Sequence, residues 1–180
     1  MSALKLLYPQ ANQDSVPVTI TLASLATSST LLAGRESNLI DNTSNLDLDH
    51  LLAGVIKLGT SPTASTSIEV WAYTPYKSAS GTKSYPAISG TGTYFTGVDA
   101  AATFGSANIK ASGALRLVAS MTADATTGLN LSFSGVSVKS LFGSMPPWYG
   151  IFVTHSTAVA LDATPANHYI GYQRVQAQSV

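Results

Sequence analysis

The chain has 180 residues, of which nine are Lys or Arg and nine are Asp or Glu, so its formal net charge is zero. Only 10% of the residues are charged, against about 25% in an ordinary globular domain, whereas about a quarter are Ser or Thr. The balanced, scattered charges exclude the basic surface typical of nucleic-acid-binding proteins. The absence of Cys excludes disulfides and thiolate metal sites.

The length is typical of one domain, and a chain of this size buries enough surface to fold around one core. We therefore expect residues 1–180 to form a single domain that begins with an extended N-terminal arm over residues 1–15. No apolar run reaches the roughly 20 residues that a membrane-spanning helix needs. We expect no membrane partner and, from the short apolar patch at Leu4, no secretion signal.

Apolar residues recur at every second position, the period of half-buried strands. Residues 16–22 form the first such run, and Pro17 favours a sheet edge there. In the run 68–73, Ile68, Val70 and Ala72 share one face, which we expect to point into the core. Further runs predict strands at 51–58, at 115–121 (with Leu115, Leu117, Ala119 and Met121 on one face), at 129–136, at 151–154 and at 169–175.

One short helix is expected near 137–143. Ser137 can accept hydrogen bonds from the first turn, and Gly143 can adopt the left-handed conformation that ends a helix. The stretch 77–97, rich in Ser, Thr, Gly and Tyr, predicts a long exposed loop. Many short strands with little helix predict an all-β fold, a single-domain antiparallel β-sandwich resembling a jelly roll.

Catalytic motifs are weak in this sequence. Glu36 and Glu69 are its only Glu residues, and the pairing of two carboxyl groups across a sugar that a glycosidase needs is not indicated by their positions. His50, His155 and His168 lack the G-x-S-x-G context of a hydrolase that could use Asp162. We expect no enzymatic activity and assign no catalytic residue.

Cofactor motifs are equally weak. The acids of the segment Asp41, Asn45, Asp47 and Asp49 lack the central Gly and the terminal Glu of a calcium loop, and acids that alternate with Leu are typical of a half-exposed strand. Gly90-Thr91-Gly92 has Phe95 where a dinucleotide fingerprint needs its third Gly. We expect no metal and no cofactor.

Aromatic residues gather around the long loop and after the Pro146-Pro147 pair. Such rings can anchor a protein interface, stack on sugars or close the ends of the sandwich, and the sequence leaves these three uses open. The candidate interface or glycan platform consists of Trp71, Tyr73, Tyr76, Tyr85, Tyr94 and Trp148.

The order of several segments resembles small jelly-roll virion proteins of tailed bacteriophages. The resemblance is carried by Gly34-Arg35-Glu36-Ser37 up to Asp41-Asn42-Thr43, by Gly59-Thr60-Ser61-Pro62-Thr63 before Ile68-Glu69-Val70-Trp71, and by Leu141-Phe142-Gly143 before Pro146-Pro147-Trp148-Tyr149-Gly150 and Ile151-Phe152-Val153.

The resemblance implies a virion location after assembly in the host cytoplasm. It also implies a non-enzymatic capsid decoration (cement) protein, whose partner is the major capsid protein or another virion protein. Free sheet edges and zero net charge add an expectation of self-association as a dimer or trimer. A carbohydrate-binding or host-recognition module of a phage fibre, tail or collar is the alternative.

Overall fold

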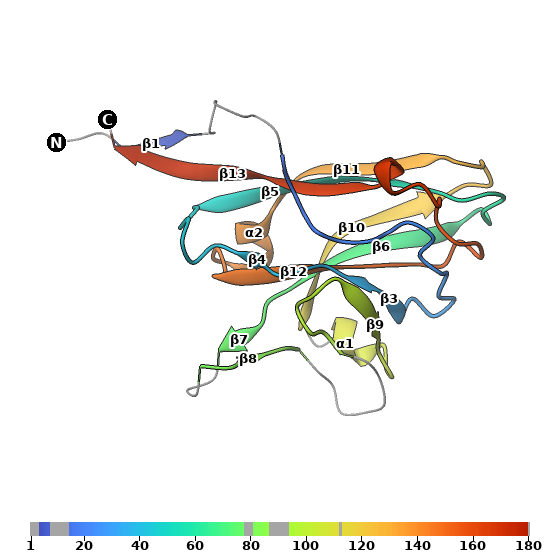
Figure 1. The fold of residues 1–180 in the computed structure, drawn as a ribbon, viewed down its shortest axis with the longest axis horizontal. Helices are drawn as coiled ribbons and strands as arrows, with labels where there is room; N and C mark the ends of the chain where they lie inside the picture. Colours follow the sequence, from blue (N-terminus) through green and yellow to red (C-terminus); the bar gives the residue numbers. More distant parts are fainter. Residues whose placement is uncertain (1–3, 8–14, 78–80, 87–93, 112, 180) are drawn as a thin grey trace.

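The computed structural model describes residues 4–7, 15–77, 81–86, 94–111 and 113–179. Most of its strands form two facing antiparallel sheets (Figure 1), and one hairpin forms a separate two-stranded sheet. The first sheet has the order β1 (Leu4–Leu7), β13 (Tyr169–Ser179), β5 (Asp49–Lys57) and β11 (Asn130–Ser137), with β2 (Val16–Pro17) also paired to β13. The second has the order β10 (Leu115–Ala123), β6 (Thr66–Tyr73), β12 (Trp148–His155), β3 (Ala33–Glu36) and β9 (Ala100–Thr103), with β4 (Ile40–Asp41) paired to β12.

The strand order is that of a jelly roll. The chain alternates between the sheets from β2 through β3, β5 and β6, stays in the second sheet for β10, and then alternates again through β11, β12 and β13. This path places two Greek keys face to face, as the jelly roll requires. The predicted all-β, jelly-roll-like sandwich is thus confirmed.

The core between the sheets follows the predicted alternation in β6. Ile68, Val70 and Ala72 are fully buried. The prediction for 115–121 is wrong at Leu117, which is 45% exposed, while Val118 is buried. The reason is a bulge between Leu117 and Ala119 in the pairing of β10 with β6, which turns one extra residue inward.

The predicted helix is confirmed as α2 (Val138–Phe142). Ser137 Oγ accepts a hydrogen bond from the N–H of Ser140 at 3.0 Å, and Gly143 ends the helix with φ +80°. A second helix, α1 (Asn108–Ala111), and the turn η1 (Pro165–Asn167) were not predicted. In the part of the chain that the structure describes, no helix is both long and apolar enough to cross a membrane.

Only the start of the predicted strand 16–22 is a strand, because the segment leaves β13 after the N–H of Val18 donates to Ile170 O at 2.8 Å. Beyond that point Asp99 Oδ1 accepts the N–H of Thr21 at 3.0 Å, in place of a strand partner. Within the predicted arm 1–15, the described residues Leu4–Leu7 form β1, whereas 1–3 and 8–14 lie outside the described residues.

The connection between β6 and β10 is a folded insertion rather than a plain loop. It carries the hairpin of β7 (Tyr76–Lys77) with β8 (Lys83–Ser84), then β9, which is the edge strand of the second sheet, and α1. In Figure 1 the hairpin and α1 lie below β12. A second hydrophobic cluster joins the insertion to the outer face of that sheet and contains Tyr73, Phe95, Ala102, Phe104, Ile109, Leu115 and Phe152. Parts of the predicted loop 77–97, at 78–80 and 87–93, lie outside the described residues.

Candidate functional site

Tyr73, one of the six candidate platform residues, lies in the core. It is fully buried, and its ring stacks on that of Phe95 with 3.8 Å between centroids and 4° between planes. Phe95 in turn meets Phe104 and Phe152 edge to face. The prediction of an exposed platform is therefore corrected at Tyr73, which links the second sheet to the insertion.

Glu36 anchors the same region. Its carboxylate is fully buried and accepts hydrogen bonds from Tyr73 O–H at 2.8 Å, from the N–H and Oγ1 of Thr96 at 2.8 Å each, and from the N–H of Gly97 at 3.0 Å. Burial, and then the Glu36 charge, raises the pKa of Tyr73 well above its usual range. Arg35, its sequence neighbour, points elsewhere and pairs with Asp99 at 2.6 Å. Glu36 thus fastens the insertion to β3 through neutral donors.

The two tryptophans each lie under a lysine. Lys110 Nζ lies 5.2 Å from the centroid of the Trp71 ring and 2.5 Å from Glu69 Oε2, which also accepts the indole N–H of Trp71 at 2.8 Å. Lys83 Nζ lies 4.8 Å from the centroid of the Trp148 ring. One face of each ring is therefore occupied by an ammonium group.

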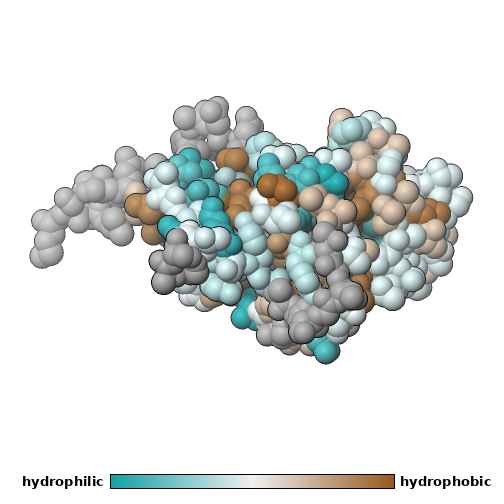
Figure 2. Space-filling view, turned by 60° about the horizontal axis from the view of Figure 1, so that its bottom comes forward, coloured by the Kyte–Doolittle hydropathy of each residue, from teal (hydrophilic) through white to brown (hydrophobic). Residues whose placement is uncertain are grey.

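The remaining candidate rings do not complete a platform. The Tyr85 ring packs edge to face on the Tyr73 ring, with 6.4 Å between centroids, and the centroid of the Tyr94 ring lies 6.4 Å from that of Phe104. Tyr76, on the hairpin, is 65% exposed. The face in Figure 2 is mostly pale, near-neutral surface with small separate apolar patches. The expected six-ring platform is thus not assembled, because its members divide between the second cluster and the surface.

The acids of the candidate calcium segment each serve a different partner. Asp41 Oδ1 accepts the N–H of Thr43 at 2.8 Å, and the Thr43 side chain and backbone lower the pKa of Asp41. Asp49 accepts the N–H of Lys139 at 2.9 Å, at the start of α2. Among the described residues no three His, Asp or Glu side chains are grouped to hold a metal ion.

The remaining acid of that segment, Asp47, belongs to a buried cluster with His50 that the sequence analysis did not predict. The side chain of Asp47 is fully buried and that of His50 is 1% exposed, with His50 Nε2 at 2.9 Å from Asp47 Oδ2. Arg174 donates to both carboxylate oxygens of Asp47, at 2.7 and 3.0 Å, and Gln176 donates to Oδ1 at 2.8 Å. The cluster lies where β13 leaves the sandwich.

The other two histidines lie in separate places. His155 is fully buried between Thr157 Oγ1 at 2.9 Å and Leu25 O at 3.0 Å, and burial lowers its pKa. His168 Nε2 lies 2.8 Å from the backbone O of Asp162. The candidate hydrolase pairing of a His with the Asp162 carboxylate is therefore not formed, since that carboxylate accepts from Asn167 at 2.7 Å.

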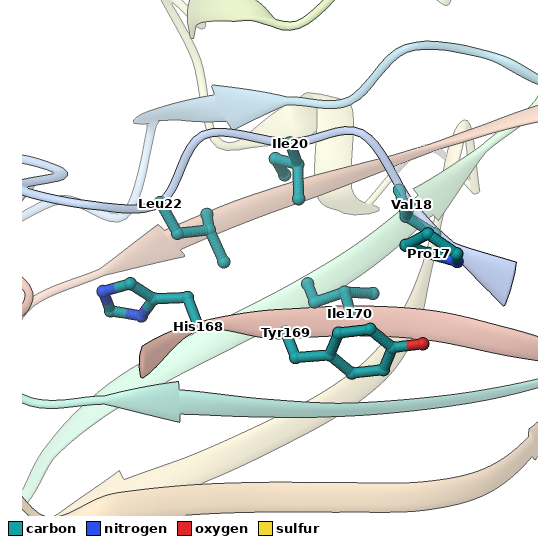
Figure 3. Close-up of a pocket in the computed structure, with 7 residues that line it drawn as sticks. All are labelled: Pro17, Val18, Ile20, Leu22, His168, Tyr169 and Ile170. Atoms are coloured by element: carbon teal, nitrogen blue, oxygen red, sulfur yellow. The ribbon is translucent and has the colours of Figure 1, made fainter. Parts of the chain in front are cut away.

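A cavity of about 150 Å³ opens where residues 17–22 leave β13 (Figure 3). Its walls are mostly apolar, and both nitrogens of His168 are engaged, Nε2 by Asp162 O and Nδ1 by the N–H of Lys57 at 3.4 Å. The cavity therefore suits a small apolar group. Its lining residues are Pro17, Val18, Ile20, Leu22, His168, Tyr169 and Ile170.

The most distinctive surface feature is a projecting two-stranded ribbon. The pairing of β13 with β5 ends at Val175, whereas β1 pairs with β13 from Leu7 opposite Gln176 to Leu4 opposite Ser179. Figure 1 shows this ribbon extending past the end of β5. Among the described residues, β1 pairs with β13 alone, so the ribbon presents free strand edges.

Comparisons with known proteins yield no match to any family model, curated protein or solved structure.

Proposed function

We propose that this chain is a non-enzymatic structural protein of a bacteriophage virion, a capsid decoration (cement) protein that binds the exterior of the assembled shell. The observation that carries the proposal is the ribbon of β1 with the end of β13, which projects from the jelly roll and whose outer edges pair with no further strand among the described residues. The sequence resemblance to small jelly-roll virion proteins supports the same reading.

Backbone chemistry explains how the ribbon would bind. Two strands alone are only marginally stable in water, and their free edges offer N–H and C=O groups to a third strand. Strand addition gives affinity through main-chain hydrogen bonds and needs no charge pairing. A chain with zero net charge meets no long-range repulsion from further copies of itself.

Stabilisation of the shell would follow from mass action. A protein that binds only the assembled shell shifts assembly toward it by its binding free energy, summed over many copies. In this proposal the partner is the major capsid protein or another virion protein. The same edges would support a symmetric dimer or trimer on the virion.

The alternative, a carbohydrate-binding or host-recognition module, is less well supported because few of the candidate rings are accessible to a sugar. Sugar stacking needs an open ring face, and one face each of Trp71 and Trp148 has a lysine above it, while Tyr73 is buried. Tyr76 is the candidate ring with the best access, at 65% exposure. We therefore rank this alternative second.

The test is co-sedimentation of the purified chain with shells assembled from the major capsid protein of the phage that encodes it. Wild type should bind saturably and stay bound in about 1 M salt, where the screening length falls to about 3 Å. Deletion of residues 1–7, which removes β1, should weaken binding at least about tenfold, whereas the matched surface variant Tyr76→Ala should bind as wild type.

Two outcomes would contradict the proposal. One is wild type that does not sediment with shells. The other is saturable binding to a host polysaccharide that Tyr76→Ala abolishes, which would favour the recognition module.

A further inference from the structure

The root of the ribbon is held by one face of β13. Tyr172, Arg174 and Gln176 lie at alternate positions and so share that face. Val175 is the last residue of β13 paired to β5, and Gln176 is the first paired to β1. These three side chains therefore span the point at which the ribbon leaves the sandwich.

Asp47, in the neighbouring loop, accepts hydrogen bonds from side chains on this face. Its Oδ2 accepts from Arg174 Nε at 2.7 Å, and its Oδ1 accepts from Arg174 Nη2 at 3.0 Å and from Gln176 Nε2 at 2.8 Å. The loop is itself fixed, because Asn42 Nδ2 donates to Asp47 O at 3.0 Å and Asn42 Oδ1 accepts the N–H of Asp47 at 2.8 Å. One rigid carboxylate thus holds residues on both sides of the ribbon root.

His50 completes the contact. Its Nε2 lies 2.9 Å from Asp47 Oδ2 and its Nδ1 lies 2.8 Å from Tyr149 O–H, while its ring stacks on Tyr172 at 4.1 Å between centroids. A carboxylate only accepts, so Nε2 carries the proton and Nδ1 of the neutral ring accepts from Tyr149. In this arrangement Nδ1 is an acceptor, so a second proton on the ring would break the hydrogen bond that Tyr149 O–H donates to it.

We propose that Asp47 and His50 form an acid-sensitive clasp that fixes the root of the ribbon, and that protonation of His50 releases it. The release itself concerns the free protein. Its consequence, weaker attachment to a shell in acid, rests on the proposed function.

The direction of the effect follows from the groups around His50. Burial lowers the pKa of His50, outweighing the Asp47 carboxylate, which raises it; Arg174 lowers it further, and Asp49 raises it slightly. A proton on Nδ1 would face the O–H of Tyr149, which is fully buried. The protonated ring is therefore better accommodated when the clasp opens to water, so acid favours the open form.

Hydrogen exchange on the free protein tests the clasp. The protection of the amides of residues 174–176, corrected for the intrinsic pH dependence of exchange, should fall by up to about tenfold between pH 7.5 and 5.5, as expected for one group with an open-state pKa near 6.5. Amides in the β6–β12 pairing, such as those at Val70 and Val153, should change less. In His50→Gln, whose amide can both donate and accept but does not titrate, the local fall should disappear.

Protection at 174–176 that is independent of pH, or that falls equally in His50→Gln, would overturn the clasp. If His50→Gln does not fold, a nuclear magnetic resonance titration of wild type replaces it. The His50 resonance should then titrate below 6.5, at the pH where the loss of protection at 174–176 levels off, and a His50 resonance that titrates at or above 6.5 would also overturn the proposal.

The exchange experiment separates this proposal from the proposed function because it contains no shell. If the chain fails to bind shells but loses protection in acid, the clasp proposal stands and the cement function is contradicted. If the chain binds shells equally at both pH values and its exchange is independent of pH, the cement function stands and the clasp proposal is contradicted.

Discussion

Tyr73→Phe removes one of the hydrogen bonds that hold the buried Glu36 carboxylate and leaves the packing of the ring almost unchanged. The lost bond, 2.8 Å from Tyr73 O–H to Glu36 Oε2, joins a charged acceptor to a fully buried donor. Hydrogen bonds to charged groups contribute about 1.5–3 kcal/mol to stability. For a chain of this size each kcal/mol shifts the melting temperature by about 2–4 °C, so a decrease of about 3–12 °C is expected.

Urea unfolding at pH 7 followed by circular dichroism measures this free energy, and the dependence on urea should stay that of wild type. The matched control is Tyr76→Phe, in which the ring is 65% exposed, and it should change stability by less than about 0.5 kcal/mol.

Glu36→Gln extends the test. Each carboxylate oxygen accepts one backbone N–H, from Thr96 or from Gly97, so either orientation of the Gln amide leaves one N–H without an acceptor. The expected cost is about 1–3 kcal/mol. If Tyr73→Phe and Glu36→Gln are both as stable as Tyr76→Phe, the role assigned to Glu36 as the anchor of the insertion is wrong.

The melting temperature should not change on addition of EDTA, and a decrease of many degrees would revive a metal site among the acids between residues 41 and 49. Burial lowers the pKa of His50 and of His155 below the ordinary 6.5, so the unfolded chain binds more protons as the pH falls below about 6.5. Stability should therefore decrease from pH 7.5 to 5.5, by at most about 1.4 kcal/mol per pH unit for each histidine, and equal urea midpoints at the two pH values would contradict this sign. Gly34→Ala would place its Cβ 2.1 Å from Val153 O and 2.9 Å from the Phe152 ring. Thermal unfolding should show a loss of about 1–3 kcal/mol, and wild-type stability would show that β3 shifts freely against β12.

The features predicted correctly are those whose causes lie close in sequence. The alternation of Ile68, Val70 and Ala72 requires only a strand with one buried face, and α2 requires only Ser137 before it and Gly143 after it. These signals do not depend on which segment lies opposite.

The features that were missed depend on partners far away in the chain. Asp47 looked like a solvated acid among leucines, yet its partners Arg174 and Gln176 follow it by 127 and 129 residues. Similarly, Tyr73 meets Glu36 from 37 residues away. Its alternation with Trp71 gave no sign that an insertion would cover this face of β6, so buried and exposed rings looked alike.

The bulge in β10 is a third case. Leu115, Leu117, Ala119 and Met121 satisfy a period of two, and nothing in their order marks Val118 as the extra residue. Its position is set by the pairing with β6, where Leu117 lies opposite Trp71 and Ala119 opposite Val70.

Electron cryo-microscopy of shells saturated with the wild-type protein would show whether the chain attaches to a shell through its ribbon, as we propose. We expect a jelly roll on the outer surface, with a strand of the shell or of a second copy running beside β1 and continuing the sheet of β13 and β5. A jelly roll bound through another face, with the ribbon edges free in solvent, or shells without bound protein, would contradict it.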